Sequence, residues 1–115
     1  MKYILIVLLS FTAVTAFAAN PPTTFNEVFT KVISQKCILC HTNPTNKPKK
    51  PVDFNTYEGV MVMVEAGNLT DSKLYQALLA GKMPPPKIIT INPDMAIEPD
   101  DIALIEKWIT DGALE

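Results

Sequence analysis

The 115-residue sequence predicts an all-α fold of about four short helices in one domain, over residues 24–115. Apolar residues recur at helical spacing in four separate segments. Glycines and prolines mark the places where these patterns end. No alternating pattern typical of strands persists, and no internal repeat is visible.

The chain begins with a segment typical of secretory signal peptides. Lys2 supplies the positive charge, residues 3–14 are mostly apolar, and Ala-Phe-Ala at 16–18 is a small-x-small cleavage site. The apolar run is short and interrupted by polar residues, which disfavours a retained membrane helix. We therefore expect residues 1–18 to be a signal peptide cleaved after Ala18, leaving a periplasmic protein without a stable membrane span.

Residues 19–23 are expected to form a linker, followed by a helix from about residue 24 into residue 37. Thr24 and Glu27 have the spacing of a capping box at its start. The apolar residues of this helix recur at helical spacing: Phe25, Val28, Phe29, Val32 and Ile33.

The first helix leads into the string Cys37-Ile38-Leu39-Cys40-His41. Thiols three positions apart on a helical turn share one face, so both can reach one flat ring. A histidine directly after the second cysteine completes the attachment signature of a c-type haem. Cys37 and Cys40 would form thioethers, and His41 would be the proximal axial ligand of the iron. The sequence therefore predicts one covalent haem c at the chain's only cysteines and only histidine.

Three other interpretations of this string were weighed. A thioredoxin-like dithiol has the same cysteine spacing, but it requires a βαβ context that the sequence lacks. A structural zinc site requires four ligands, and only three are present. A disulfide between Cys37 and Cys40 is compatible with an oxidising compartment.

Residues 42–51 contain three prolines and several short polar residues, which predict a loop. One of its carbonyls is a candidate acceptor for the second ring N–H of His41. Lys47, Lys49 and Lys50 form the basic cluster of this loop. We favour a solvated loop, and the alternative is a patch that steers a redox partner to the haem edge.

Two helices are expected next. Asn55 and Glu58 would cap the second helix, and Gly67 would end it. Its apolar face would carry Tyr57, Val60, Met61 and Val64. The third helix would begin at Thr70 or Asp71 and end at Gly81, with Leu74, Tyr75, Leu78 and Leu79 on its apolar side.

The stretch Gly81-Lys82-Met83-Pro84-Pro85-Pro86 is expected to be extended, because prolines disfavour a helix and hold the backbone near polyproline II. Such a stiff segment would present Met83 as the distal axial ligand, opposite His41. We expect residues 81–98 to be a loop over the distal haem face. The rival methionines are Met61, Met63 and Met95.

The last helix is predicted from Pro99 to Gly112. Proline suits the first helical position, and Asp100 and Asp101 suit the first turn, where the helix dipole favours anions. Its apolar residues are Ile102, Leu104, Ile105, Trp108 and Ile109. We expect Trp108 to pack this helix against the first one.

These features resemble a class I cytochrome c over the whole mature chain. The closest likeness is to small bacterial domains in which a Leu-Tyr helix precedes Gly-x-Met-Pro-Pro and a Trp-Ile-x-x-Gly-Ala ending follows. Here these are residues 74–75, 81–85 and 108–113. The resemblance implies a monohaem electron carrier whose N- and C-terminal helices cross.

After residue 18 the chain has nine lysines, no arginine and twelve acidic residues, a formal charge of −3, which disfavours nucleic-acid binding. Because His41 and Met83 would fill both axial positions, we expect an electron carrier for periplasmic redox partner proteins and not an enzyme. One alternative is a haem subunit of a larger oxidoreductase. The other is a haem protein that binds a small ligand or peroxide, if Met83 does not ligate.

Overall fold

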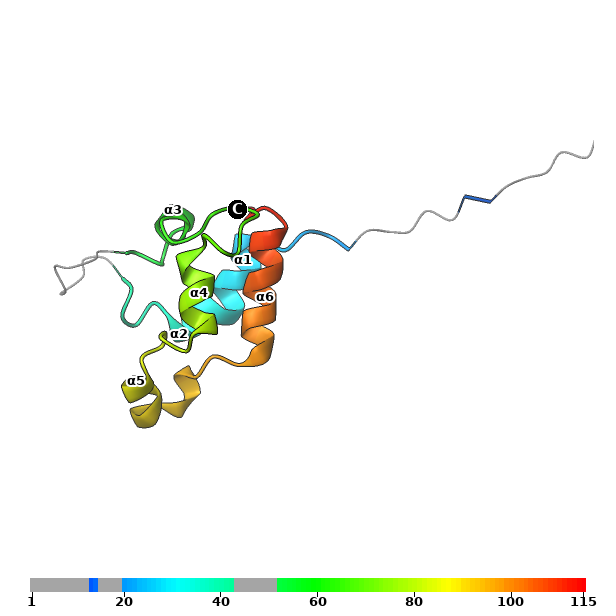
Figure 1. The fold of residues 1–115 in the computed structure, drawn as a ribbon. Coiled ribbons are helices and arrows are strands. Elements are labelled where there is room, and N and C mark those ends of the chain that lie inside the picture. Colours follow the sequence, from blue (N-terminus) through cyan, green and yellow to red (C-terminus); the bar gives the residue numbers. More distant parts are fainter. Residues whose placement is uncertain (1–12, 15–19, 43–51) are drawn as a thin grey trace, which may run out of the picture.

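The computed structural model describes residues 13–14, 20–42 and 52–115. This part of the chain is helical and contains no β-strand, only two isolated bridges, so the predicted all-α class is confirmed. Helices α1, α4 and α6 lie side by side, and α5 lies away from them (Figure 1). The predicted signal peptide, apart from residues 13–14, and the lysine cluster at 47–50 lie outside the described residues.

The first predicted helix forms as three consecutive segments. They are α1 (Phe25–Val28), the π-helical η1 (Phe29–Ile33) and α2 (Ser34–Lys36). Together they run from residue 25 to residue 36, as the spacing of the apolar residues indicated. The π-helical middle was not predicted, because the periodicity of five apolar residues does not distinguish a helix with one widened turn from a regular one.

Thr24 is the N-cap of this helix, but its side chain makes no capping hydrogen bond, so the predicted capping box is wrong. Glu27 pairs with Lys31 at 2.8 Å instead. The start of the helix is held by backbone contacts: Thr24 forms a parallel bridge with Leu114, and the Phe25 N–H donates to the Leu114 carbonyl at 2.8 Å. A hydrogen bond to Leu114, a residue distant in the sequence, thus replaces the hydrogen bond of a side-chain cap.

Helix α3 (Tyr57–Met61) is shorter than predicted and ends well before Gly67. Its N-cap is Thr56 and not Asn55, because the Thr56 hydroxyl accepts the Gly59 N–H at 3.0 Å. Beyond the helix, the Ser72 hydroxyl accepts the N–H of residue 65 and donates to a nearby carbonyl. These tertiary hydrogen bonds satisfy backbone groups that a longer helix would have used.

Helix α4 (Lys73–Leu79) begins after Ser72, slightly later than predicted. It ends as expected at Gly81, which has a φ of +68°. The Gly81 and Lys82 N–H groups donate to the carbonyls of residues 78 and 77, the pattern of a Schellman motif. Leu79 was expected in the core and is 58% exposed, because it lies off the face that carries the buried leucines of this helix.

Residues 81–98 were expected to form a loop, but they are not a loop throughout. The segment contains helix α5 (Pro86–Ile91) and a 3-10 turn, η2 (Pro93–Met95). Pro86 occupies the first helical position, where a missing N–H removes no helix hydrogen bond. The prolines therefore exclude a helix only up to residue 85, and they start one at residue 86.

Helix α6 (Pro99–Thr110) has nearly the predicted bounds. Glu98 is its N-cap, and Asp101 completes a capping box with it. The helix ends at Asp111 and Gly112, whose φ is +107°. This last helix could be predicted closely because each of its signals is local.

The N- and C-terminal helices pack against each other through aromatic residues, as predicted for Trp108. Trp108 is fully buried, its ring centroid lies 6.1 Å from that of Phe25, and its Nε1 donates to the Leu114 carbonyl at 2.8 Å. The other core residues with no exposure are Val28, Val32, Ile33, Val60, Ile105, Ile109 and Ala113. They come from α1, η1, α3, α6 and the residue after Gly112, and α4 adds Leu74, Tyr75 and Leu78 to the same core.

Candidate functional site

The chain closes into a tight turn directly after α2, and this turn brings Cys37, Cys40 and His41 together. The N–H groups of Cys40 and His41 both donate to the Cys37 carbonyl, at 3.2 and 3.0 Å. Cys37 is half-buried, Cys40 is exposed, and the two thiols are not joined in a disulfide. The turn therefore keeps both thiols on one short stretch of backbone, as the signature requires.

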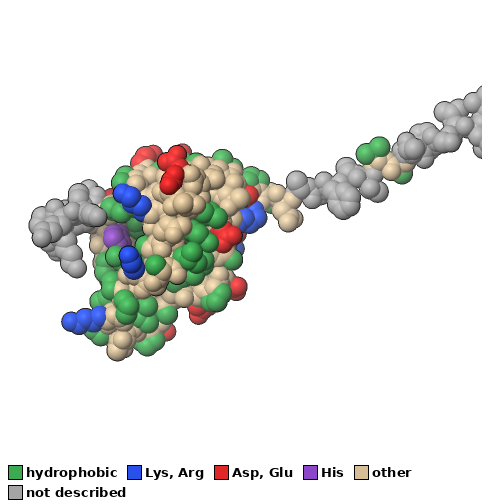
Figure 2. Space-filling view, viewed as in Figure 1, with side chains coloured by type: hydrophobic (Ala, Val, Ile, Leu, Met, Phe, Trp, Pro, Cys, Tyr) green, Lys and Arg blue, Asp and Glu red, His purple; other side chains and the backbone are tan. Residues whose placement is uncertain are grey.

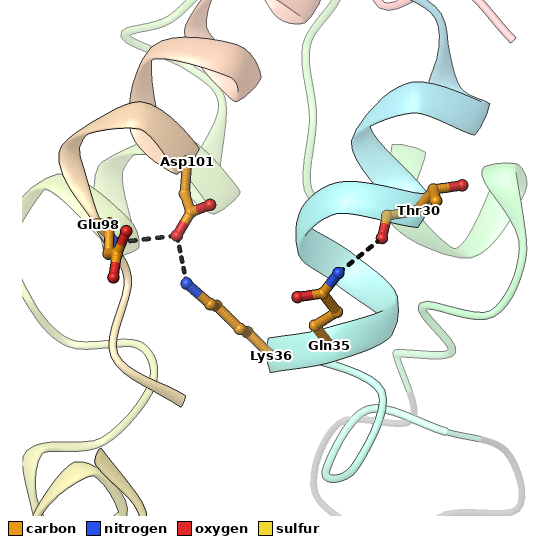
Figure 3. Close-up of polar contacts among 5 residues, drawn as sticks. All are labelled: Thr30, Gln35, Lys36, Glu98 and Asp101. Atoms are coloured by element: carbon orange, nitrogen blue, oxygen red, sulfur yellow. Dashed lines mark hydrogen bonds and ion pairs between the residues drawn. The ribbon is translucent and has the colours of Figure 1, made fainter. Parts of the chain in front are cut away.

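An ion pair fixes the start of this turn against the last helix. Lys36 Nζ lies 2.5 Å from Asp101 Oδ2, and the same oxygen accepts the Glu98 N–H at 2.9 Å (Figure 3). Both side chains of the pair are mostly buried. Because Lys36 directly precedes Cys37, the pair connects the position of the first thiol to the N-terminus of α6.

The π-helical segment changes the hydrogen bonding just before the turn. The Thr30 carbonyl accepts from the side chain of Gln35 at 3.1 Å (Figure 3). It also accepts from the Ser34 hydroxyl at 3.2 Å. The Ile33 carbonyl accepts from the N–H groups of Cys37 and Ile38. A widened turn shifts the direction of every later side chain, so η1 contributes to where Cys37 points. Such segments are frequent at functional sites.

His41 is half-buried and stacks on Phe54, with ring centroids 4.7 Å apart and an angle of 24° between the planes. The Phe54 N–H donates to the His41 carbonyl at 2.8 Å. The chain thus returns to the histidine after residues 42–51, and Phe54 limits how the imidazole can rotate. Phe54 was missed from the sequence because no helical pattern surrounds it. In Figure 2, part of the histidine side chain, coloured purple, is visible at the surface.

The predicted carbonyl partner of the second His41 ring N–H belongs to residues 42–51. Apart from Thr42, that stretch lies outside the described residues. The prediction therefore stays a prediction.

A hollow of about 510 Å³ lies beside the cysteine turn. It lies between the segment carrying the thiols and the segment after α5, and is lined by Ser34, Gln35, Ile38, Leu39, Thr42, Asn92 and Met95. Its volume is within the range of small-molecule and cofactor sites. The two walls come from residues 34–42 and 92–95, which the sequence alone could not place side by side.

The four candidate methionines have different environments. Met61 and Met63 pack against the core. Met95 is 5% exposed and lines the hollow. Met83 is 43% exposed and does not line it. Among the four, Met83 is therefore the one with an exposed side chain, and Met95 belongs to the surroundings of the cysteine turn.

Large apolar side chains are exposed around the same region. Leu39 is 74% exposed in the cysteine turn, and Ile91 is 73% exposed at the end of α5. Helix α5 has no buried residue at all. Exposed apolar groups of this size are typical of surfaces that another apolar body covers.

Burial, with a smaller contribution from Asp101, raises the pKa of the Cys37 thiol to about 11. The thiol is therefore neutral at pH 7, and a thioether would also leave this half-buried position without charge. Within residues 20–42 and 52–115, no group of three or more histidine, cysteine, aspartate or glutamate side chains is arranged to hold a metal ion.

Comparisons of the chain with protein-family models, with curated proteins and with solved structures each return no match. In the part of the chain that the structure describes, no helix has the length and apolar character needed to cross a membrane.

Proposed function

We propose that this chain is a periplasmic electron-transfer protein of the class I cytochrome c type. It carries one covalent haem, with thioethers at Cys37 and Cys40 and with His41 and Met83 as axial ligands. The observation that carries the proposal is the closed turn of residues 37–41, which holds two thiols and an imidazole next to a hollow.

The residues present fit a haem. Two neutral thiols three positions apart suit attachment to neighbouring edges of one ring, and the apolar Ile38 and Leu39 between them suit its face. Bound there, the haem would supply one-electron transfer between the ferrous and ferric states. The Phe25–Trp108 contact brings α1 and α6 together, which crossed N- and C-terminal helices of a cytochrome c fold would require, and it supports the proposal in this respect.

His41 and Met83 would define the chemistry as electron transfer. His41 is oriented by its stacking on Phe54, so little further ordering is needed when it binds the iron. Met83 is exposed, and it lies between α4 and α5 in the chain. A histidine and methionine pair fills both axial positions, raises the potential and leaves no place for a substrate.

A second candidate function rests on the same geometry. Met83 does not line the hollow, whereas Met95 does. If Met83 stays away from the iron, the distal position would be open, and the protein would bind a small ligand such as carbon monoxide or peroxide. The two functions make opposite predictions for ligand binding to the reduced protein.

Mass spectrometry of the exported, denatured protein tests the attachment. We expect the mass of residues 19–115 plus one haem, because thioethers survive denaturation and the signal peptide is removed after Ala18. Double replacement of Cys37 and Cys40 by alanine should abolish the added mass, and Met61→Ala should keep it as a control. A wild-type chain with no added mass, produced together with a c-type maturation system, would contradict the proposal.

A further inference from the structure

The candidate proximal histidine contacts an aromatic residue that lies outside the haem signature. The rings of His41 and Phe54 are stacked, with centroids 4.7 Å apart and 24° between the planes. The Phe54 N–H also donates to the His41 carbonyl at 2.8 Å. Phe54 therefore contacts His41 through both its backbone and its side chain, and the two contacts restrict the main chain and the imidazole of the histidine together.

Phe54 is itself held firmly by the residues around it. Its side chain belongs to the hydrophobic core, as does that of Val52, and both are buried. Between them, the Asp53 carbonyl lies so close to helix α3 that a Cβ at Gly59 would collide with its oxygen. The Asp53 side chain accepts from the Asn55 N–H at 2.9 Å and from the Asn55 amide at 3.1 Å. The backbone on both sides of Phe54 is thus fixed against α3 and the core.

The stacked contact is compatible with metal binding by the imidazole. A ring nitrogen binds a metal through a lone pair in the plane of the ring, whereas Phe54 covers a face of the ring. Stacking therefore restricts rotation of the imidazole without occupying the direction of a metal–nitrogen bond. A backbone carbonyl from residues 42–51, the orienting group expected from the sequence, would act in the plane of the ring instead.

We propose that Phe54 is the positioning residue of the proximal ligand. It sets the plane of the His41 imidazole by stacking, and α3 sets the place of Phe54 through the contact between Asp53 and Gly59. The inference rests on the proposed function, because the plane of the imidazole affects the haem only if His41 binds the iron. A ligand whose orientation is fixed beforehand loses less rotational freedom on binding, and its plane determines how it interacts with the iron.

The contact between the two rings is tested first, by NMR of the exported wild-type protein. Reduced six-coordinate haem is diamagnetic, so nuclear Overhauser effects can be measured in the reduced protein, and also in a protein that carries no haem. We expect such effects between the ring protons of His41 and Phe54, and their absence would overturn the inference. A protein without haem would contradict the proposed function instead, so the two failures are distinguishable.

The effect on the haem is tested with two substitutions of Phe54 in the haem-loaded protein. Phe54→Leu keeps an apolar side chain in the core but removes the flat ring, and Phe54→Tyr keeps the ring. In the ferric state, the shifts of the haem methyl protons report the orientation of the axial imidazole. We expect Phe54→Leu to change the pattern of these shifts and Phe54→Tyr to retain it. The same pattern in all three proteins would overturn the inference and would assign the orientation to a carbonyl of residues 42–51.

A control variant separates positioning of the imidazole from a general loss of packing. Val28 is fully buried in α1, at the end of the first helix that is distant from Cys37 in the chain. Val28→Ala removes apolar volume from the same core, as Phe54→Leu does. We expect Val28→Ala to keep the wild-type pattern of haem methyl shifts. Equal changes in the two variants would mean that the pattern follows the packing of the whole core, and this would overturn the inference.

The role of α3 is tested by a substitution that acts on Phe54 from its neighbour. The atoms nearest to a Cβ at position 59 belong to Asp53 and Thr56, so Gly59→Ala must displace the backbone next to Phe54. We expect this variant to change the haem methyl shifts as Phe54→Leu does, and Glu58→Ala in the same turn to leave them unchanged. A wild-type pattern in Gly59→Ala would overturn the role of α3 in placing the imidazole.

Discussion

Asp111 connects the two ends of the folded domain with a single carboxylate. Its Oδ2 accepts from Lys107 Nζ and from the Thr23 N–H, the latter at 3.1 Å. The hydrogen bond from Lys107, followed by that from Thr23, lowers the pKa of Asp111. The residue lies where α6 ends and where the N-terminal segment enters the domain, so its ionisation affects how these ends are held.

The stability contributed by Asp111 should depend on pH. Because the folded-state pKa lies below the unfolded value of about 3.9, the contribution is full above that value and is lost as the pH falls through the folded-state pKa. Urea unfolding should therefore show Asp111→Asn less stable than wild type at pH 7 and nearly equal to it at pH 2. Asp94→Asn, which removes an exposed carboxylate, is the control. A difference that is the same at both pH values would contradict this role.

Glycine is required at position 59 because the backbone of Asp53 comes very close to it, and not because of unusual φ and ψ angles. A Cβ at this position would lie 1.6 Å from the Asp53 carbonyl oxygen. Although alanine normally favours a helix, we expect Gly59→Ala to destabilise the protein by about 1–3 kcal/mol, the usual range for overpacking. Thermal unfolding measures the loss. Glu58→Ala in the same turn serves as the control. A Gly59→Ala variant that is more stable than wild type would contradict the close contact between position 59 and the Asp53 backbone.

At the scale of elements, the ion pair between α2 and α6 holds the start of the turn at residues 37–41. The Lys36 and Asp101 side chains are 11% and 15% exposed, whereas Lys31 and Glu27 in a neighbouring pair are 62% and 39% exposed. An ion pair removed from water costs much when one partner is deleted, because the other charge stays unpaired. An exposed pair contributes little.

Lys36→Met should therefore destabilise the protein by about 3 kcal/mol, because it leaves the Asp101 carboxylate mostly buried without its cation. Lys31→Met is the matched control and should cost less than about 1 kcal/mol. Both values come from urea unfolding of the purified variants. Equal costs for the two variants would mean that burial does not distinguish the pairs, and the anchoring role of Lys36 would be rejected.

The elements that could be predicted from the sequence are those whose signals are local. Helix α6 has its proline, acidic first turn and terminal glycine within its own span, and α4 has the glycine that closes its Schellman motif. The early end of α3 depends on Ser72, which lies in a later segment. Helix α5 was missed because the prolines were interpreted only as helix breakers, although Pro86 starts the helix.

At the scale of the whole molecule, the sequence suggests candidate ligands but not the residues that surround them. The string from Cys37 to His41 is contiguous, so its chemistry could be predicted without a fold. Phe54 and Met95 approach this string only after the chain has returned to it, and no spacing in the sequence encodes that return. Which methionine lies opposite His41 also depends on the whole fold and not on sequence spacing. Ligation by Met83 therefore stays a prediction.

The central claim is a six-coordinate c-type haem bound by His41 and Met83. It is tested most directly by the absorption spectrum of the exported protein, ferric and then reduced, before and after addition of carbon monoxide. We predict a c-type spectrum with the weak sulfur-to-iron band in wild type, unchanged by carbon monoxide, and a spectrum that shifts with carbon monoxide in Met83→Ala but not in Met95→Leu. A wild-type spectrum that shifts with carbon monoxide would contradict ligation by Met83, and the absence of any haem would contradict the account as a whole.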